Sequence, residues 1–310
     1  MALELRVRSA TWEAPDILSY ELRALDGREL PAFTAGAHID LTLPNGLIRS
    51  YSLVNDQSER HRYVIGVQKD RASRGGSTWV HENLRPGGLV TVNGPRNNFP
   101  LDESAARSVL IAGGIGITPI VSMVRRLAAL QKEWTLFYCA RTRAQAAFSD
   151  ALQGDVRYNF DGEPGGKLLD MAAVVADWPA GTHFYCCGPL PMLAAFEAAT
   201  AALPREQVHV EYFTAKEPPA VAGGFNVVLA KSGRQFAVPP GKTILETLLD
   251  AGLEVPYSCM EGVCGTCETR VVEGVPDHRD LVLSEAEHAE GKTMMICCSG
   301  CKGERLVLDL

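Results

Sequence analysis

Four cysteines near the end of this chain constrain its structure more than any other feature. Cys259, Cys264 and Cys267 lie in the stretch "VPYSCMEGVCGTCET" (255–269) with the spacing C-x4-C-x2-C, and Cys297 follows after 29 further residues. This spacing is the plant-type arrangement of ligands for a 2Fe–2S cluster. Structural zinc usually takes two C-x2-4-C pairs, so the spacing favours an iron–sulfur cluster over zinc.

The fourth cluster ligand has three candidates, because "MMICCSGC" (294–301) contains three cysteines. We predict Cys297 from its distance and from its place after the strand-like "KTMMI". Adjacent side chains of a strand point to opposite faces, so Cys298 is expected to point away as a packing residue. Small residues in the loop allow backbone N–H groups to approach the sulfurs; these are Ser258, Gly262, Gly265 and Thr266.

Composition excludes several classes of partner. The 310 residues carry a net charge of -7, which repels nucleic acid and anionic membranes. The first residues mix charged and apolar side chains without the apolar core of a signal peptide, which predicts a cytoplasmic protein. The apolar stretch "VLIAGGIGITPIVSMV" (109–124) is too short and too rich in glycine for a membrane span. It is predicted to be a buried strand that leads into a helix.

Hydrophobic patterning divides the chain into three segments. Residues 1–103 form short alternating runs separated by turn formers, as in an antiparallel β-barrel. From 104 onward, apolar strands alternate with helical stretches, which predicts a parallel α/β sheet. The stretch "AKEPPAVAGG" (215–224) has the composition of a linker. Behind it, residues 225–310 contain 13 acidic and 8 basic side chains and the cysteines.

The order of these segments resembles a known family. Residues 225–310 resemble a plant-type ferredoxin, and the whole chain is similar to the phthalate dioxygenase reductase and vanillate demethylase reductase family. The resemblance implies an FMN-binding barrel at 1–103, an NADH-binding α/β domain at 104–222 and a β-grasp 2Fe–2S ferredoxin domain at 223–310.

The segment "IRSYSLVN" (48–55) matches the family's Arg-x-Tyr-Ser flavin signature. Tyr51 can lie along the flavin ring, Ser52 can bond a polar ring atom, and Arg49 can pair with phosphate. Ser50 belongs to the same candidate set. An edge strand of a barrel without ligand is the alternative explanation.

The segment "SRGGSTWVHENL" (73–84) opens a predicted helix with two glycines and two hydroxyl residues. Free N–H groups at a helix start bind phosphate, although Ser77 could instead act as a plain N-cap. The compact loop favours FMN over FAD, which stays open. The candidate phosphate residues are Arg74, Gly75, Gly76, Ser77 and Thr78.

A glycine-rich turn marks the predicted nicotinamide segment. In "IAGGIGITPI" (111–120), Gly113, Gly114 and Gly116 allow a pyrophosphate to approach the backbone, and Thr118 can cap the helix. This is not the G-x-G-x-x-G fingerprint, and tight turns between a strand and a helix need glycine in any case.

Four further segments complete the candidate nicotinamide site. "YCCGPLPML" (185–193) resembles a Cys-Gly-Pro motif, which implies Cys187, Gly188 and Pro189 beside the nicotinamide, although Cys187 could be a buried residue with no role. Arg141 could contact ribose or phosphate, whereas Asp161 would repel the extra phosphate of NADPH, in line with NADH as the family's donor.

The last of these segments, "VHVEYFTA" (208–215), resembles the end of the family's nucleotide domain. The resemblance implies that Phe213 covers the flavin until nicotinamide displaces it. A plain terminal strand is the alternative.

Together these segments predict a reductase that passes electrons from NADH to FMN to 2Fe–2S. Flavin can accept a hydride and release its electrons singly, so the protein needs to position and tune its cofactors more than to supply an acid or base. Ser52, Cys187 and Phe213 are expected nearest to the reacting atoms. The resemblance implies that the acceptor is the Rieske centre of an aromatic-ring dioxygenase or O-demethylase. A haem or di-iron oxygenase, or a non-enzymatic redox sensor, are the alternatives.

Overall fold

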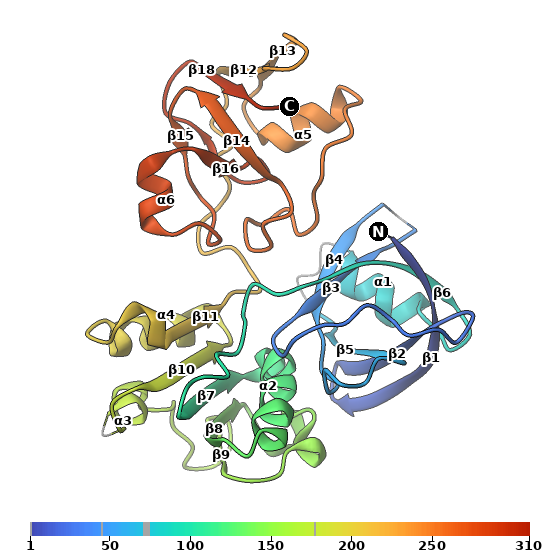
Figure 1. The fold of residues 1–310 in the computed structure, drawn as a ribbon, viewed down its shortest axis with the longest axis vertical. Coiled ribbons are helices and arrows are strands. Elements are labelled where there is room, and N and C mark those ends of the chain that lie inside the picture. The colour runs from blue at the N-terminus through green and yellow to red at the C-terminus, as the bar shows by residue number, and fades with distance from the viewer. Residues whose placement is uncertain (1, 45, 71–74, 177) are drawn as a thin grey trace. The chain divides into compact units, whose positions relative to one another are not determined.

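The computed structural model describes residues 2–44, 46–70, 75–176 and 178–310. The chain divides into two compact units, Met1–Glu211 and Tyr212–Leu310 (Figure 1). The first contains an antiparallel sheet and a parallel sheet, and the second contains the cysteine loop. Arg74, one of the predicted phosphate residues, lies outside the described residues.

The antiparallel sheet forms a barrel in the order β4-β3-β6-β1-β2-β5. Alternating residues of β1, including Leu3, Leu5 and Val7, are buried, as a half-buried strand requires. The antiparallel bridge between Leu53 and Ile65 joins the two ends of the sheet. The strands are β1 (Leu3–Ala14), β2 (Ile17–Ala24), β3 (His38–Thr42), β4 (Ile48–Ser52), β5 (Tyr63–Gln68) and β6 (Leu89–Arg96).

The parallel sheet has the order β11-β10-β7-β8-β9. All six residues of β10 and all but the first residue of β7 are buried, as expected for strands covered on both faces. Its strands are β7 (Arg107–Gly113), β8 (Glu133–Ala140), β9 (Val156–Phe160), β10 (Thr182–Cys187) and β11 (Val208–Glu211). Its helices are α2 (Ile117–Ala129), α3 (Met171–Val175) and α4 (Leu190–Thr200).

A shared apolar core joins the barrel to the parallel sheet within the first unit. Ala14 and Ile17 of the barrel belong to the same buried cluster as Ile117 of α2. The Gly36 N–H donates to the Ser122 hydroxyl of α2 at 3.1 Å. Barrel and parallel sheet therefore form one packed body, which fixes the barrel loops relative to the carboxyl edge of the parallel sheet.

The second unit is built on a five-stranded sheet with the order β13-β12-β18-β14-β16, and a two-stranded β15-β17 ladder. Helix α5 (Ile244–Asp250) starts with a capping box between Thr243 and Glu246 and buries Ile244, Leu245 and Leu248, on the predicted face. The other elements are β12 (Phe225–Leu229), β13 (Gln235–Val238), β14 (Glu268–Glu273), β15 (Pro276–Asp277), α6 (Glu285–Glu290), β16 (Thr293–Met295), β17 (Gly300–Cys301) and β18 (Arg305–Leu308).

The predicted linker is part of the second unit. Ala220 N–H donates to the Cys298 carbonyl at 2.7 Å, and Gly241 N–H donates to the Val221 carbonyl at 2.8 Å. The boundary between the two compact units lies between residues 211 and 212. The Pro- and Ala-rich stretch at 215–224 falls in the second unit because its backbone forms hydrogen bonds with that unit. The three-domain boundaries at 103 and 222 stay a prediction.

In the part of the chain that the structure describes, no helix has the length and apolar character needed to cross a membrane. The apolar stretch at 109–124 forms β7, a short 3-10 turn η1 (Gly114–Gly116) and the first half of α2. It is a buried strand that leads into a buried helix, as predicted.

Candidate functional site

The cysteine loop carries buried sulfurs at its predicted cluster positions. Cys259, Cys264, Cys267 and Cys297 are each less than one tenth exposed. The Glu261 N–H donates to the Cys259 sulfur at 3.3 Å, and the Cys259 N–H donates to the Cys264 sulfur at 3.5 Å. The Thr266 hydroxyl lies 3.3 Å from the Cys264 sulfur. The small residues of the loop thus bring hydrogen-bond donors to the sulfurs, as a cluster requires.

The four thiols converge on one another. Thiol contacts from Cys264, then from Cys297, lower the pKa of Cys259, and contact with Cys297 lowers the pKa of Cys267. Four mutually close thiols, buried and supplied with N–H donors, are the donor set of a 2Fe–2S cluster. The residues present therefore fit that cluster.

The structural reason for preferring Cys297 differs from the one that the sequence suggested. Strand β16 ends at Met295, and Ile296–Cys298 form a turn, so the alternation of side chains along a strand does not apply there. Cys297 instead contacts Cys259 and Cys267. The Cys298 thiol donates to the Met295 carbonyl at 3.7 Å and packs below the loop, where a Cβ on Gly262 would meet its sulfur at 2.5 Å. Cys298 does not point away from the loop, contrary to expectation.

The Arg-x-Tyr-Ser segment lies on β4, next to the seam of the barrel. Ser52 ends the strand and is buried, and Ser50 donates a hydrogen bond to the Asp40 carboxylate at 2.7 Å. Burial raises the pKa of Tyr51 well above its ordinary value, although the nearby Arg49 opposes this shift. Tyr51 stays an uncharged ring at any pH at which the protein works.

The amino end of α1 (Gly76–Asn83) meets Arg49. A Cβ built on Gly76 would lie 2.5 Å from Nε of Arg49, so only glycine allows the guanidinium to approach the helix start. Gly75, with φ 91°, is the N-cap residue and has no side chain of its own to cap the helix. The alternative reading of Ser77 as the N-cap is therefore wrong; its hydroxyl accepts the Asp70 N–H at 3.1 Å. Helix N–H groups and a guanidinium meeting at one point fit a phosphate.

The two glycine motifs of the parallel sheet meet at its carboxyl edge. Strands β7 and β10 are neighbours, with Ala112 opposite Cys187. A Cβ on Gly116 would lie 2.2 Å from the Cys187 carbonyl oxygen, and a Cβ on Gly113 would lie 2.7 Å from Pro189 Cδ. The turn after β7 and the Cys187–Pro189 segment are thus in backbone contact, at the edge where α/β sheets bind nucleotides.

Thr118 has a different role from the predicted one. Helix α2 begins at Ile117 with Gly116 as its N-cap, and no side chain caps it. The Thr118 hydroxyl donates to the Ile115 carbonyl at 2.9 Å instead. Its methyl group faces β5 of the barrel, where a Cβ on Gly66 would meet it at 2.7 Å. The prediction that Thr118 caps the helix is wrong, because the helix begins two residues earlier than a Thr118 cap needs.

Comparisons with known proteins agree with this geometry. The 2Fe-2S iron-sulfur cluster binding domain matches residues 227–302, and the oxidoreductase NAD-binding domain matches residues 110–157. Phenoxybenzoate dioxygenase subunit beta of Ectopseudomonas oleovorans is 57% identical over 311 residues, covering 99% of this chain and 97% of that protein. Tetrachlorobenzoquinone reductase of Sphingobium chlorophenolicum is 52% identical over 317 residues, covering 99% and 98%.

A solved structure covers all three parts of the chain. Phthalate dioxygenase reductase, described as a modular structure for electron transfer from pyridine nucleotides to 2Fe–2S, is 41% identical with a TM-score of 0.78. The match covers 100% of this chain and 98% of that one. The chain belongs to the phthalate dioxygenase reductase family. It is an oxidoreductase that passes electrons from NADH through FMN to a 2Fe–2S cluster, as predicted.

In this member of the phthalate dioxygenase reductase family, two predicted nucleotide residues follow neighbouring strands. Arg141 comes directly after β8 and is exposed, and Asp161 comes directly after β9 and is half-buried. The Gly162 N–H donates to the Arg141 carbonyl at 2.8 Å, which holds the two strand ends together. Both residues lie at the same sheet edge as Gly113 and Cys187. Phe213 belongs to the second unit and is 37% exposed, so its expected place over the flavin stays a prediction.

Glu211 is a candidate that the sequence analysis missed. It ends β11 directly opposite Cys187, and its Oε2 is buried with no hydrogen-bond partner among the described residues. Burial raises the pKa of Glu211 to about 8, and the pKa of the Cys187 thiol is raised by its own burial and then by Glu211. Perturbed acids of this kind mark functional sites. The signal was present in "VHVEYFTA", where a carboxylate follows Val208, His209 and Val210 at the end of a short strand.

We expect Glu211 to lower the stability of the protein progressively as pH rises from about 5 to about 8. An unfolded Glu211 ionises near its ordinary value, whereas the folded one keeps its proton up to about pH 8, so the unfolded state binds fewer protons across that window. Glu211→Gln should remove this part of the pH dependence and raise the melting temperature above pH 8. Melting curves at several pH values measure the effect. Equal slopes for both proteins would show that Glu211 ionises normally.

Proposed function

We propose that this protein is the reductase component of a Rieske-type aromatic-ring dioxygenase or O-demethylase, which it meets transiently in the cytoplasm. The observation that carries the proposal is the presence of four converging buried thiols in the same chain as a nucleotide edge and a flavin barrel. The 57% identity to a protein named as a dioxygenase subunit supports an oxygenase as the acceptor.

The cofactors supply the redox chemistry: flavin takes two electrons as hydride and gives them up singly, and the cluster carries one at a time. The chain's own residues bind and orient. In our proposal, Arg49 and the helix start at Gly75–Thr78, with Arg74, hold the flavin phosphate. Ser52 bonds the flavin ring, and Tyr51 lies along it.

The nicotinamide site is proposed at the carboxyl edge of the parallel sheet. The Gly113–Gly116 turn would hold the pyrophosphate, while Cys187, Gly188 and Pro189 border the nicotinamide. Phe213 would cover the flavin when NADH is absent. Arg141 and Asp161 would flank the adenosine ribose, where the Asp161 carboxylate disfavours the additional phosphate of NADPH.

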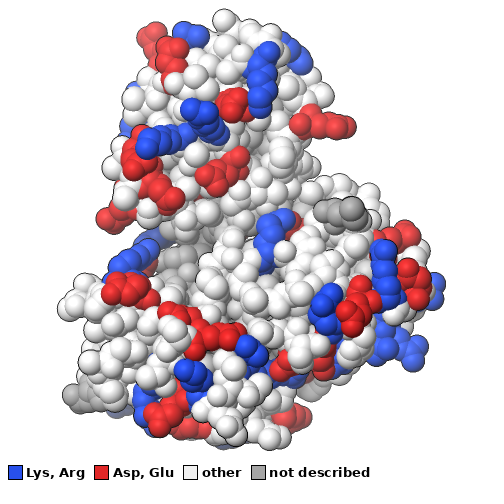
Figure 2. Space-filling view, viewed as in Figure 1, with Lys and Arg blue, Asp and Glu red and all other residues white. Residues whose placement is uncertain are grey.

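Surface charge agrees with a protein partner better than with nucleic acid. On the face drawn in Figure 2, basic and acidic side chains are intermingled among the described residues, without the continuous basic stripe that follows a phosphate backbone. The second unit, Tyr212–Leu310, contains the four cluster cysteines and is called the cluster unit below; it has more acidic than basic residues. A partner that docks there is expected to offer basic groups.

Arg49→Met should weaken FMN binding by roughly 10- to 100-fold, because a charge-assisted phosphate pair contributes about 1.5–3 kcal/mol. The matched control is Arg8→Met on barrel strand β1, which should bind FMN as the unchanged protein does. Fluorescence quenching of FMN by the flavin-free protein gives both dissociation constants. Equal affinities for the Arg49→Met variant and the unchanged protein would remove Arg49 from the flavin site.

The acceptor is tested by supplying alternatives to one purified protein. When the protein is supplied with NADH, a Rieske oxygenase should convert its aromatic substrate, and product should form in proportion to the NADH consumed. The rival function is quinone reduction, favoured by 52% identity to a tetrachlorobenzoquinone reductase. Rapid reduction of tetrachlorobenzoquinone, with no electron delivery to any Rieske oxygenase tried, would show that quinone reduction is the function.

A further inference from the structure

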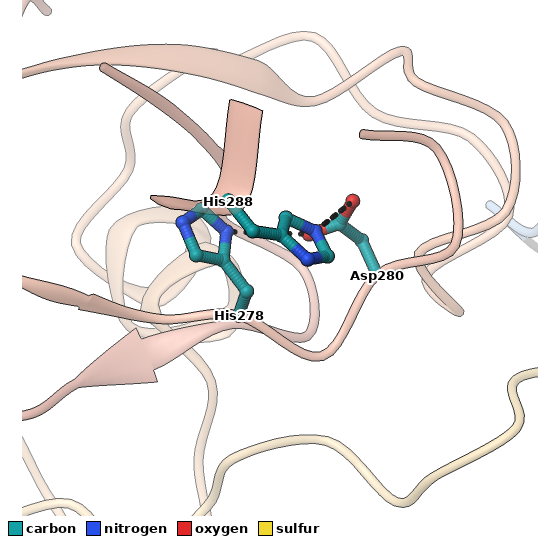
Figure 3. A group of neighbouring side chains, drawn as sticks. All are labelled: His278, Asp280 and His288. Carbon is teal, nitrogen blue, oxygen red and sulfur yellow. Dashed lines mark hydrogen bonds and ion pairs between the residues drawn. The ribbon is translucent and has the colours of Figure 1, made fainter. Parts of the chain in front are cut away.

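A second group of ligand-type side chains lies beside the cysteine loop. His278 and Asp280 come from the segment after β15, and His288 comes from α6 (Figure 3). One possible ligand atom from each residue lies within 4.8 Å of the other two. The Asp280 side chain is fully buried, the His278 side chain is 7% exposed and the His288 side chain is 29% exposed.

Backbone hydrogen bonds fix the Asp280 carboxylate. Its Oδ2 accepts the N–H groups of Val282 at 3.3 Å and Leu283 at 2.9 Å, and lies 3.2 Å from Nε2 of His288. Its Oδ1 faces Nδ1 of His278 at 3.5 Å. The carboxylate is therefore held in one orientation, with one oxygen toward each imidazole.

His278 is buried without the hydrogen bonds that a buried imidazole needs. Both of its ring nitrogens are inaccessible and have no hydrogen-bond partner in the described part of the chain. The 3.5 Å approach to Asp280 lacks the geometry of a hydrogen bond. Buried polar atoms are almost always satisfied, so a buried imidazole whose Nε2 has no partner among the described residues, and whose Nδ1 makes only a long contact with a fixed carboxylate, indicates a ligand.

The ligand types, and the protonation state of His278, suit a cation. The two imidazole rings stack with centroids 4.3 Å apart and an interplanar angle of 19°. Burial, and then the neighbouring His288, lower the pKa of His278, so its ring is neutral at pH 7 and offers a lone pair. Two imidazoles and one carboxylate are ligands that zinc and neighbouring transition metals prefer, whereas calcium and magnesium take oxygen ligands.

We propose that His278, Asp280 and His288 form a binding site for a divalent transition-metal ion of the zinc class, separate from the four cluster cysteines. Zinc–nitrogen distances of about 2.0–2.1 Å place tetrahedral ligand atoms about 3.3–3.4 Å apart, so small side-chain shifts complete the site. In this site, water would take the fourth ligand position. The ion would enter from the side of His288, because that side chain is the most exposed of the three. The Leu281 N–H donates to the Gly262 carbonyl at 2.9 Å, so the bound ion also braces the cysteine loop.

The site is tested on the intact protein with its flavin and cluster in place. The protein is freed of loosely bound metal with a chelator and dialysed against micromolar zinc chloride, and zinc and iron are measured together. We expect one zinc per chain with iron unchanged. His278→Gln should weaken zinc binding by more than the roughly 10- to 100-fold that loss of an outer-shell partner costs. The exposed His61→Gln is the matched control and should bind zinc as the unchanged protein does.

Copper identifies the ligands directly. The oxidised cluster and oxidised flavin give no EPR signal, so Cu²⁺ bound to the oxidised protein should show coupling to two imidazole nitrogens, reduced to one in His288→Gln. The proposal fails if no zinc is retained, if His278→Gln binds it as tightly as the unchanged protein, or if zinc enters only as iron is lost. Cluster and flavin absorbance show that each variant is folded. The electron-transfer assays are separate, so a negative zinc result leaves the proposed function in place.

Discussion

Ending the chain after Ala215 should leave a flavoprotein that NADH still reduces but that delivers no electrons to its oxygenase. The barrel and the parallel sheet share one apolar core, and the core of the second unit consists of its own residues. The shortened protein keeps Phe213 and loses the segment that contains Ala220 and Val221, which bonds to the cluster unit. Stopped-flow reduction of the flavin should proceed within about threefold of the intact rate, since hydride transfer depends on positioning within the first unit.

The second measurement for this shortened protein is oxygenase turnover. We expect the rate seen without any reductase, because the one-electron carrier has been removed. Ferricyanide, which accepts electrons singly, controls for an intact flavin. Oxygenase turnover at the rate of the intact protein would show that the cluster lies outside the electron route.

Cys297→Ser should abolish the cluster, and Cys298→Ser should not. The Cys297 thiol contacts Cys259 and Cys267, whereas the Cys298 thiol bonds the Met295 carbonyl below the loop. Loss of one of four thiolates should lower iron and acid-labile sulfide below about one tenth of the normal content, because the site and its metal stabilise each other. EPR of the reduced proteins and iron analysis give the comparison. If Cys298→Ser loses the cluster and Cys297→Ser keeps it, the fourth ligand is Cys298.

Elements with strong periodicity were predictable from the sequence. The barrel alternation, the buried strand at 109–113 and the apolar face of α5 follow from side-chain spacing alone. The course of residues 215–224 was not predictable from the sequence. Their Ala- and Pro-rich composition does not reveal the hydrogen bonds that join Ala220 to Cys298 and Val221 to Gly241. Composition indicates that this segment has no core of its own. The residues on which it packs are determined by the tertiary structure.

The candidate site divides in the same way. The cysteine spacing predicted the four cluster ligands, and their thiols converge in the structure. This was possible because three of the four ligands lie in one short loop with a characteristic spacing. The turn at Ile296–Cys298 and the start of α2 before Thr118 depend on the packing of the surrounding segments, and so does the burial of Glu211 Oε2 without a hydrogen-bond partner among the described residues. Local patterns carry no information on such packing. His278 and His288 likewise meet only because α6 folds back on the segment after β15.

Strand β18 is made last in its unit yet occupies the middle of the five-stranded sheet, between β12 and β14. During synthesis, the three cysteines of the loop emerge before Cys297 and before this central strand. The sheet behind the loop cannot close until Arg305–Leu308 have been made. The three loop thiols must therefore stay reduced and unclustered on the nascent chain until β18 has been made, and iron and sulfide can be delivered only after that point. Overproduction that outpaces cluster delivery should accumulate a colour-deficient, flavin-loaded form in which only the second unit is unfinished.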